Sequence, residues 1–270
     1  MAHINLLFFG DVVGQPGRRA LRQQLSKLKE QFKADVTIVN GENSAGGRGI
    51  TPKIAKSLFA AGTDVITTGD HVWDQHELMA YLDKEPRILR PLNYPTGTVG
   101  SGCVILDYPF GKVAILNAQG RTFMQPPLEN PFVLVTQKVE ELREQGVSII
   151  FLDFHAETTS EMIGMGRCLD GLASGVVGTH THVQTADESI FPNGTGYLTD
   201  AGMCGPIESI LGREIEPVVR RFKTALHAKF PVAKGPVLLC GVCITVDSDT
   251  GKAVAIERFQ HRVDNWHLQP

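Results

Sequence analysis

The sequence lacks an apolar run long enough to cross a membrane, because its longest charge-free apolar stretch falls far short of the roughly 20 residues that a spanning helix needs. The segment from Met1 to Asp11 contains no cationic stretch followed by a long apolar one, so we expect no signal peptide. An excess of charge is missing as well, since 26 Lys and Arg stand against 29 Asp and Glu and give a net charge of −3. This balance predicts no membrane partner and no strong nucleic-acid surface.

Cysteine is scarce and odd in number. Five cysteines in 270 residues, without a signal peptide, indicate a reduced protein of the cytoplasm. Cys240 and Cys243 have the spacing of a redox or zinc pair, but residues three apart on a strand face opposite sides and no second pair exists. We therefore expect both thiols in the core. Linkers, repeats and low-complexity tracts are also absent, so the chain, 1–270, is predicted to form a single domain.

Short apolar runs that end in Gly, Asp, Asn or His alternate with segments of helical periodicity, which is the pattern of β-α-β units. The expected strands are Ile4–Gly10, Val36–Asn40, Val65–Thr68, Ile149–Phe154 and Ser174–Gly178. The expected helices are one carrying Leu21, Leu25, Leu28 and Phe32, then Pro52–Ala61, Asp74–Leu82 and Pro131–Gln145. Hairpins are expected at Cys103–Asp107 with Val113–Asn117, and at Val237–Val246 with Ala253–Gln260. The fold class is therefore mixed α/β.

Five expected strands end in residues with an oxygen or imidazole donor. These residues are Asp11, Glu42, Asn43, Asp70, His155, His180 and His182. One Asp after a strand is usually only a turn former or a helix cap. In open α/β sheets, however, the carboxyl ends of the strands gather at one edge, and three carboxylates there would repel one another without a cation. The sequence therefore predicts a metal centre.

The donor types narrow the choice of metal. Mixed oxygen and nitrogen donors without a thiolate suit transition metals, with iron or manganese first and zinc or cobalt as alternatives, whereas magnesium and calcium favour oxygen alone. Seven candidate ligands are too many for one tetrahedral site. We therefore expect two ions, with Glu42 as a carboxylate able to bridge them.

Five blocks of sequence surround these ligands and span nearly the whole chain. They read Gly10-Asp11-Val12-Val13-Gly14, Asn40-Gly41-Glu42-Asn43, Gly120-Arg121-Thr122-Phe123, Asp153-Phe154-His155-Ala156-Glu157 and Gly178-Thr179-His180-Thr181-His182-Val183-Gln184-Thr185-Ala186-Asp187. This set resembles the calcineurin-like metallophosphoesterases. In the residues within each block it is most similar to the bacterial YmdB-like branch of that superfamily. The resemblance implies an α-β-β-α sandwich of two mixed sheets with the helices outside.

The resemblance also implies how the ligands divide between the ions. One ion would be held by Asp11, Glu42, Asn43 and His182, and the other by Glu42, Asp70, His155 and His180. The chain departs from the family at Asp70, where the family has Asn. An additional carboxylate there would lower the Lewis acidity of the second ion and raise the pKa of its bound water.

The activity implied by the resemblance is hydrolysis of a phosphodiester by a hydroxide that bridges the two ions, with 2′,3′- or 3′,5′-cyclic nucleotides as substrates. The partner is then a small-molecule phosphodiester, and self-association into a homo-oligomer stays open. His71 follows Asp70 and matches the family's general acid, which protonates the leaving alkoxide. The alternative for His71 is a structural role in orienting a metal ligand.

Other interpretations compete with this one. Gly10 to Gly17 resembles a phosphate loop, but no Lys-Ser or Lys-Thr pair follows, so P-loop and dinucleotide-binding functions are excluded. Amidohydrolases also use a His-x-His pair, but on the first strand of a barrel. A regulatory protein that keeps the metal with incidental turnover remains an alternative. Arg48, Arg90 and Arg121 lie near the expected edge and are candidates for gripping a phosphate, or plain surface residues.

Overall fold

The computed structural model describes residues 2–266, and its architecture follows from the alternation of apolar side chains along the strands. In β1 (His3–Phe9), Leu6 and Phe8 enter one buried cluster, while Leu7 and Phe9 point the other way into a second. A strand with two apolar faces must be covered on both sides. Phe8 meets Phe151 of the opposite sheet with ring centroids 5.2 Å apart, so the first cluster is the interface between two sheets.

The two sheets are both mixed. The first has seven strands in the order β2 (Asp11–Val12), β11 (Met203–Pro206), β12 (Val237–Asp247), β1, β3 (Val36–Asn40) and β4 (Val65–Thr67), with β13 (Ala253–Val263) also paired to β12. The second has six strands in the order β5 (Cys103–Tyr108), β6 (Gly111–Gln119), β7 (Ile149–His155), β8 (Gly175–Thr179), β10 (Gly196–Leu198) and β9 (Ser189–Ile190). Strands β1, β3 and β4 run parallel to one another, as do β6, β7 and β8.

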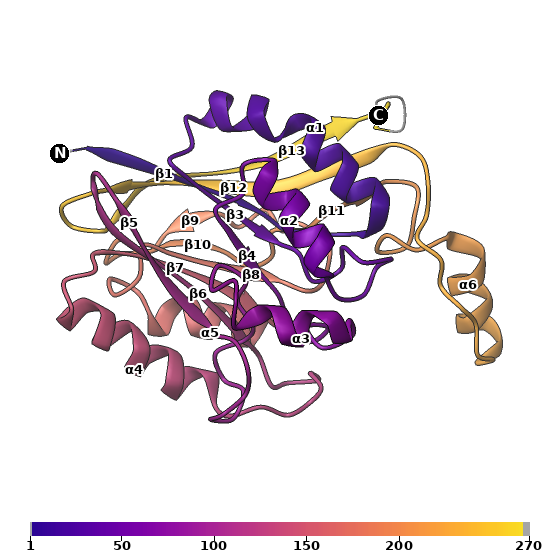
Figure 1. Ribbon diagram of the computed structural model, residues 1–270, viewed down its shortest axis with the longest axis horizontal. Coiled ribbons are helices and arrows are strands. Elements are labelled where there is room, and N and C mark those ends of the chain that lie inside the picture. The colour runs from indigo at the N-terminus through magenta and orange to yellow at the C-terminus, as the bar shows by residue number, and fades with distance from the viewer. Residues whose placement is uncertain (1, 267–270) are drawn as a thin grey trace.

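Helices cover the outer faces of both sheets (Figure 1). On the first sheet lie α1 (Gly14–Phe32), α2 (Pro52–Ala60) and α3 (His76–Leu82), and on the second lie α4 (Pro131–Glu144) and α5 (Thr159–Cys168). The remaining helix, α6 (Ile215–Thr224), projects from the edge of the molecule and buries only Val218 (Figure 1). No helix among residues 2–266 combines the length and apolar character needed to cross a bilayer.

The predicted α/β class and the α-β-β-α sandwich are confirmed, as are both antiparallel hairpins and the burial of Cys240 and Cys243. Thr51 caps α2 as its position before Pro52 indicates, with its hydroxyl accepting the Ile54 N–H. The helix expected from Asp74 begins instead at His76. The Asp74 carboxylate does not cap it because it pairs with Arg48 and His71.

The sequence pattern does not predict helices α5 and α6 or the short strands β9 to β11. Helix α5 contains Gly164 and Gly166, and glycine is a poor helix former. Gly166 is required by packing, because a Cβ there would overlap the Tyr197 ring. Helix α6 lies far from both sheets, so little of its sequence is constrained to an apolar face that meets the core.

Candidate metal centre

The candidate ligands lie where parallel strands of the two facing sheets end. Asp11 follows β1, Glu42 and Asn43 follow β3, Asp70 follows β4, His155 is the last residue of β7, and His180 and His182 follow β8. Contacts between Glu42 and His155 join the two sheets at this edge. The structure thus brings all seven candidate residues to one end of the sandwich.

Four of them form a tight group: Glu42, Asp70, His155 and His180 each offer a ligand atom, and these atoms lie within 4.8 Å of one another. His155 Nε2 is 3.0 Å from Asp70 Oδ1 and 3.3 Å from Glu42 Oε1. His180 Nδ1 lies 3.0 Å from the same His155 nitrogen. Carboxylate oxygens and imidazole nitrogens converge on a single point, as the ligands of one metal ion do.

The other three candidates, Asp11, Asn43 and His182, adjoin this group through Glu42. Asn43 Nδ2 lies 2.9 Å from Glu42 Oε1, 3.1 Å from His182 Nε2 and 3.4 Å from Asp11 Oδ1. His182 Nε2 and Asp11 Oδ1 are 3.8 Å apart. Three acceptors therefore surround one amide nitrogen, the partially positive group. Rotating the Asn43 amide by 180° would present its oxygen to a cation among the same acceptors.

The tautomer of His155 is fixed by hydrogen bonds on the Nδ1 side of its ring. Its Nδ1 lies 2.9 Å from Thr179 Oγ1, and the Thr179 hydroxyl donates to Asp153 Oδ1 at 2.7 Å. Because the hydroxyl proton is used on Asp153, Thr179 accepts the Nδ1 proton and Nε2 keeps its lone pair for a metal. Neither Asp153 nor Thr179 is among the functional residues that the sequence predicts. The sequence does hold a signal for Asp153: side chains two residues apart on a strand share a face, so Asp153 lies on the same face of β7 as His155.

The two histidines after β8 are oriented by other contacts. His182 Nδ1 donates to the Leu211 carbonyl at 3.1 Å, which again leaves Nε2 toward the site. His180 turns its Nε2 to Glu157 at 3.1 Å and its Nδ1 to the cluster. His180 and His182 have φ of 108° and 65°. Such left-handed conformations are costly for residues with a Cβ and are found where function demands them.

The electrostatics of the group favour an added positive charge. Burial is the largest influence on the Glu42 carboxyl and would raise its pKa, but the charge and hydrogen bond of His155, with the charge of His71, together lower this pKa. Burial likewise opposes ionisation of Asp70, and hydrogen bonds from His155 and His180 hold its pKa well below the usual range. Burial would lower the pKa of His155, yet Glu42 and Asp70 raise it well above the ordinary value. The excess of negative charge that favours a proton on His155 would also favour a metal cation bound between the ligands.

The space and the donor set fit a transition-metal ion. Gly69 precedes Asp70, and a Cβ at this position would overlap Glu42 Oε2 and the His155 ring. The missing side chain therefore leaves room for the carboxylate and the imidazole to approach each other. Two carboxylates and two imidazoles with ring nitrogens directed inward suit manganese, iron, zinc or cobalt.

His71 stands beside the group without belonging to it. Its Nδ1 lies 3.3 Å from Asp74 Oδ2 and 3.7 Å from Asp70 Oδ2, and its side chain is 23% exposed. The carboxylates engage Nδ1, so Nε2 is the ring nitrogen available to a substrate.

The three arginines that the sequence offers as phosphate ligands lie in different environments. Arg90 is buried and donates to the carbonyls of Pro91, Thr98 and Val99, so its interpretation as a phosphate ligand is wrong. Its guanidinium satisfies backbone carbonyls of the segment that precedes β5. Arg121 is exposed, and Arg48 lines a pocket beside His71.

Comparison with known proteins agrees with this geometry. A model of the YmdB-like protein family matches residues 7–259. A Bacillus subtilis (strain 168) protein named 2′,3′-cyclic-nucleotide 2′-phosphodiesterase is 48% identical over 266 residues, which cover 98% of this chain and 100% of that protein. The structure of a phosphatase from Mycoplasma pneumoniae superposes with a TM-score of 0.92 at 34% identity, covering 100% of this chain and 98% of that one. The NAD nucleotidase of Haemophilus influenzae shares the fold, with a TM-score of 0.62 at 13% identity over 97% of this chain and 56% of its own.

The fold and the donor set together define an enzyme of the metallophosphoesterase class, and the phosphatase and nucleotidase neighbours have the same architecture. Within that class, the chain belongs to the YmdB-like protein family, whose model spans most of its length.

Proposed function

We propose that the protein hydrolyses nucleoside 2′,3′-cyclic phosphates at the P–O2′ bond, leaving a 3′-phosphate. The observation that carries the proposal is the convergence of Glu42, Asp70, His155 and His180 within 4.8 Å at the end of the sandwich. The name of the 48% identical Bacillus subtilis protein supplies the substrate class. 3′,5′-Cyclic nucleotides are the second candidate substrates, because nothing in the donor group depends on which ribose oxygen leaves.

Two ions would divide the ligands. Glu42, Asp70, His155 and His180 would hold one, and Asp11, Glu42, Asn43 and His182 the other, with Glu42 shared. When bound, two such ions supply a water of lowered pKa and positive charge at the phosphoryl oxygens.

The protein's own residues then orient the reaction. Thr179 and Asp153 keep the His155 tautomer fixed, and Leu211 does the same for His182. His71 is the acid for the leaving O2′, because Asp74 accepts its Nδ1 proton and directs Nε2 outward as the proton donor.

The test combines metal analysis with turnover. Protein purified without chelators and protein reloaded with manganese or iron are assayed against bis-p-nitrophenyl phosphate and against 2′,3′- and 3′,5′-cyclic AMP. We expect two ions per chain and the highest kcat/KM for the 2′,3′-cyclic nucleotide. Full metal content without turnover would instead favour a binding or regulatory role.

The role of His71 has a separate test. His71→Ala should leave the metal content intact and slow hydrolysis of the cyclic nucleotide about 10²- to 10⁴-fold, which is the usual range for a general acid. The loss should shrink for bis-p-nitrophenyl phosphate, since p-nitrophenolate leaves without a proton. Equal losses for both substrates would contradict the acid role.

A further inference from the structure

A pocket of about 520 Å³ opens beside His71, and its wall is rich in positive charge. The polar residues that line it are Arg48, His71, Arg213, Arg221, His227 and Lys229. These residues are far apart in the sequence and come from the loop after Glu42, the segment after β4, and the segments before, within and after α6. The size is typical of a pocket for a small ligand.

Little in the protein neutralises this charge. Arg48 pairs with Asp74 at 3.0 Å. Arg213, Arg221 and Lys229 have no carboxylate oxygen within 4.0 Å anywhere in residues 2–266. Cations gathered in a concavity without counter-charges create a positive potential that attracts an anion.

Hydrogen bonds hold the Arg213 side chain in place in the wall of the pocket. Its guanidinium donates to the carbonyls of Gly46, Gly47 and Phe230, and these bonds fix its position between two loops. Burial and then the neighbouring charge of Arg48 lower its pKa, so the two guanidinium groups lie close enough to repel each other. An anion between them would relieve that repulsion.

Two of the residues that line the pocket connect it to the candidate metal centre. His71, the proposed acid, is part of its wall. Arg213 lies two residues after Leu211, whose carbonyl holds His182, and it bonds the loop that follows Asn43. A group bound in the pocket would therefore lie beside a phosphodiester held at the metal centre, on the side of His71.

We propose that this pocket binds a second phosphate of the substrate, the one on the 5′ oxygen of a nucleoside 2′,3′-cyclic phosphate. The inference rests on the proposed function and names its substrate class more closely. Only the ribose separates the two phosphates, which matches a pocket that shares His71 with the metal centre. Water adds across the P–O2′ bond as before, and the second phosphate is bound without being changed.

The test compares adenosine 2′,3′-cyclic phosphate with its 5′-phosphorylated form in the metal-loaded enzyme. We expect the 5′-phosphate to raise kcat/KM about 10- to 100-fold, the range for hydrogen bonds between charged groups. The double variant Arg221→Gln, Lys229→Gln should lose most of this gain while hydrolysing the unphosphorylated substrate as before. Both side chains are exposed, so the substitutions leave the core intact.

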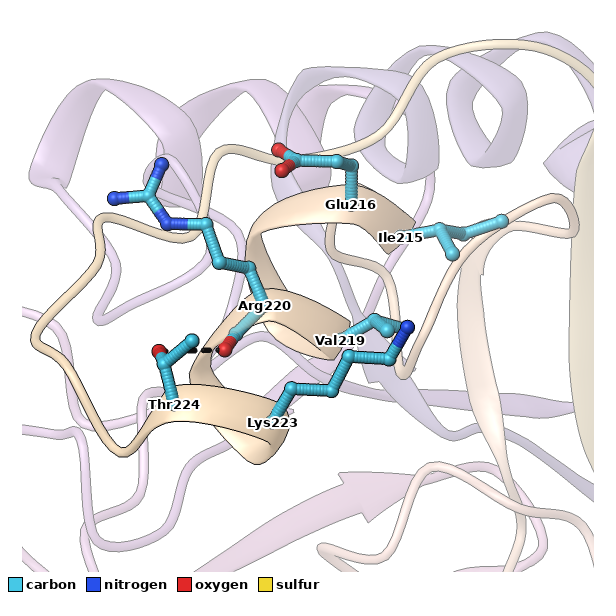
Figure 2. A pocket seen from close by; sticks show the side chains of 6 residues that line it. All are labelled: Ile215, Glu216, Val219, Arg220, Lys223 and Thr224. Atoms are coloured by element: carbon cyan, nitrogen blue, oxygen red, sulfur yellow. Dashed lines mark hydrogen bonds between the residues drawn. The ribbon is translucent and has the colours of Figure 1, made fainter.

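The matched control is Arg220→Gln, Lys223→Gln, which removes the same charge from the same region. Figure 2 shows Arg220 and Lys223 on a face of α6 that lines a different hollow, and neither residue lines the basic pocket. We expect this variant to keep the full preference for the 5′-phosphate. A dinucleotide ending in a 2′,3′-cyclic phosphate separates the two sources: an equal gain assigns the pocket to an RNA end, and no gain assigns it to a free nucleotide.

A binding measurement separates this inference from the proposed function. Calorimetry with adenosine 3′,5′-bisphosphate and adenosine 3′-phosphate requires no turnover. Tighter binding of the bisphosphate, lost in the Arg221 and Lys229 variant alone, would support the pocket even if no cyclic nucleotide were hydrolysed. Equal affinities for the two ligands, or equal losses in both double variants, would overturn it.

Discussion

One half of the candidate metal centre consists of Glu42, Asp70, His155 and His180, and the other consists of Asp11, Asn43 and His182. In the first half, His155 is fully buried at the end of β7 and is held through Thr179 by Asp153. In the second half, His182 lies in a left-handed loop conformation and is held by the carbonyl of another loop residue, Leu211. We call these the strand half and the loop half after His155 and His182, although His180 in the strand half follows its strand and Asp11 in the loop half begins β2.

The difference indicates how metal affinity is distributed. His155, fixed in a strand with a buried hydrogen-bond network, loses little freedom when the ion binds, whereas His182 in its loop must be ordered first. We therefore expect the strand half to bind its ion more tightly and the loop half to lose its ion first on dilution or with a weak chelator.

The largest expected effect comes from removing one histidine from each half. His155→Ala should abolish binding at the strand half and lower phosphodiesterase activity on the order of 10³-fold or more, because the shared Glu42 loses its partner ion as well. His182→Ala should leave about one tightly bound ion per chain. Elemental analysis after dialysis checks both, and loss of both ions in His182→Ala would show that the halves do not differ as described.

A smaller effect is expected from Gly69→Ala, which keeps every ligand. The added methyl group would overlap Glu42 Oε2 and His155, and a displacement near 1 Å can cost about 10²-fold in rate. The matched control is Gly164→Ala in α5, where a Cβ would meet only Phe132 carbons at 3.4 Å, an ordinary contact. Metal content and kcat should fall in the first variant only. Unchanged activity in Gly69→Ala would mean that the approach of Glu42 to His155 is not needed.

Thr179→Val tests the support behind His155. Without the hydroxyl, the His155 Nδ1 proton loses its acceptor, and we expect a 10- to 100-fold weaker metal affinity. Thr37→Val is the control, since Thr37 Oγ1 is buried and has no hydrogen-bond partner within residues 2–266. Competition with a chromogenic chelator measures both affinities. Similar affinities in the two variants would assign Thr179 to packing alone.

The last prediction concerns stability rather than activity. Asp200 accepts hydrogen bonds from the backbone N–H and the hydroxyl of Thr181, which lies between the two histidines. Burial raises the pKa of this carboxyl to about 7, above the value near 3.9 of an unfolded Asp. The folded state therefore holds a proton that the unfolded state releases between these values, so the Asp200 contribution to stability falls as pH rises from about 4 to 7.

Denaturant unfolding of the wild type and Asp200→Asn at pH 4.5 and 7.5 measures this contribution. The free energy of unfolding of the wild type should fall relative to that of the variant at the higher pH, by at most about 4 kcal/mol. A constant difference between the two proteins would mean that Asp200 is already ionised at the lower pH.

The sequence by itself determined the mixed α/β class and the set of candidate ligands, and the resemblance of its blocks to a known family implied the sandwich. A strand and the polar residue at its end occupy about ten residues of sequence. The strand Val36–Asn40 and the candidate ligand Glu42 after it could therefore be predicted without knowing what packs against them. The family blocks carried the same information. Helices α5 and α6 could not be predicted from the sequence, because the glycines of α5 answer contacts that exist only in the folded chain and α6 buries only Val218.

Only the tertiary structure decided how those residues act together. The division into a strand half and a loop half, the Thr179 and Asp153 support, and the basic pocket all join residues distant in sequence. Arg213 meets Gly47 across 166 positions, and Asp11 meets the His180 N–H across 169. Such pairings depend on the relative orientation of two sheets and their loops, which packing of the whole core sets and no local pattern encodes.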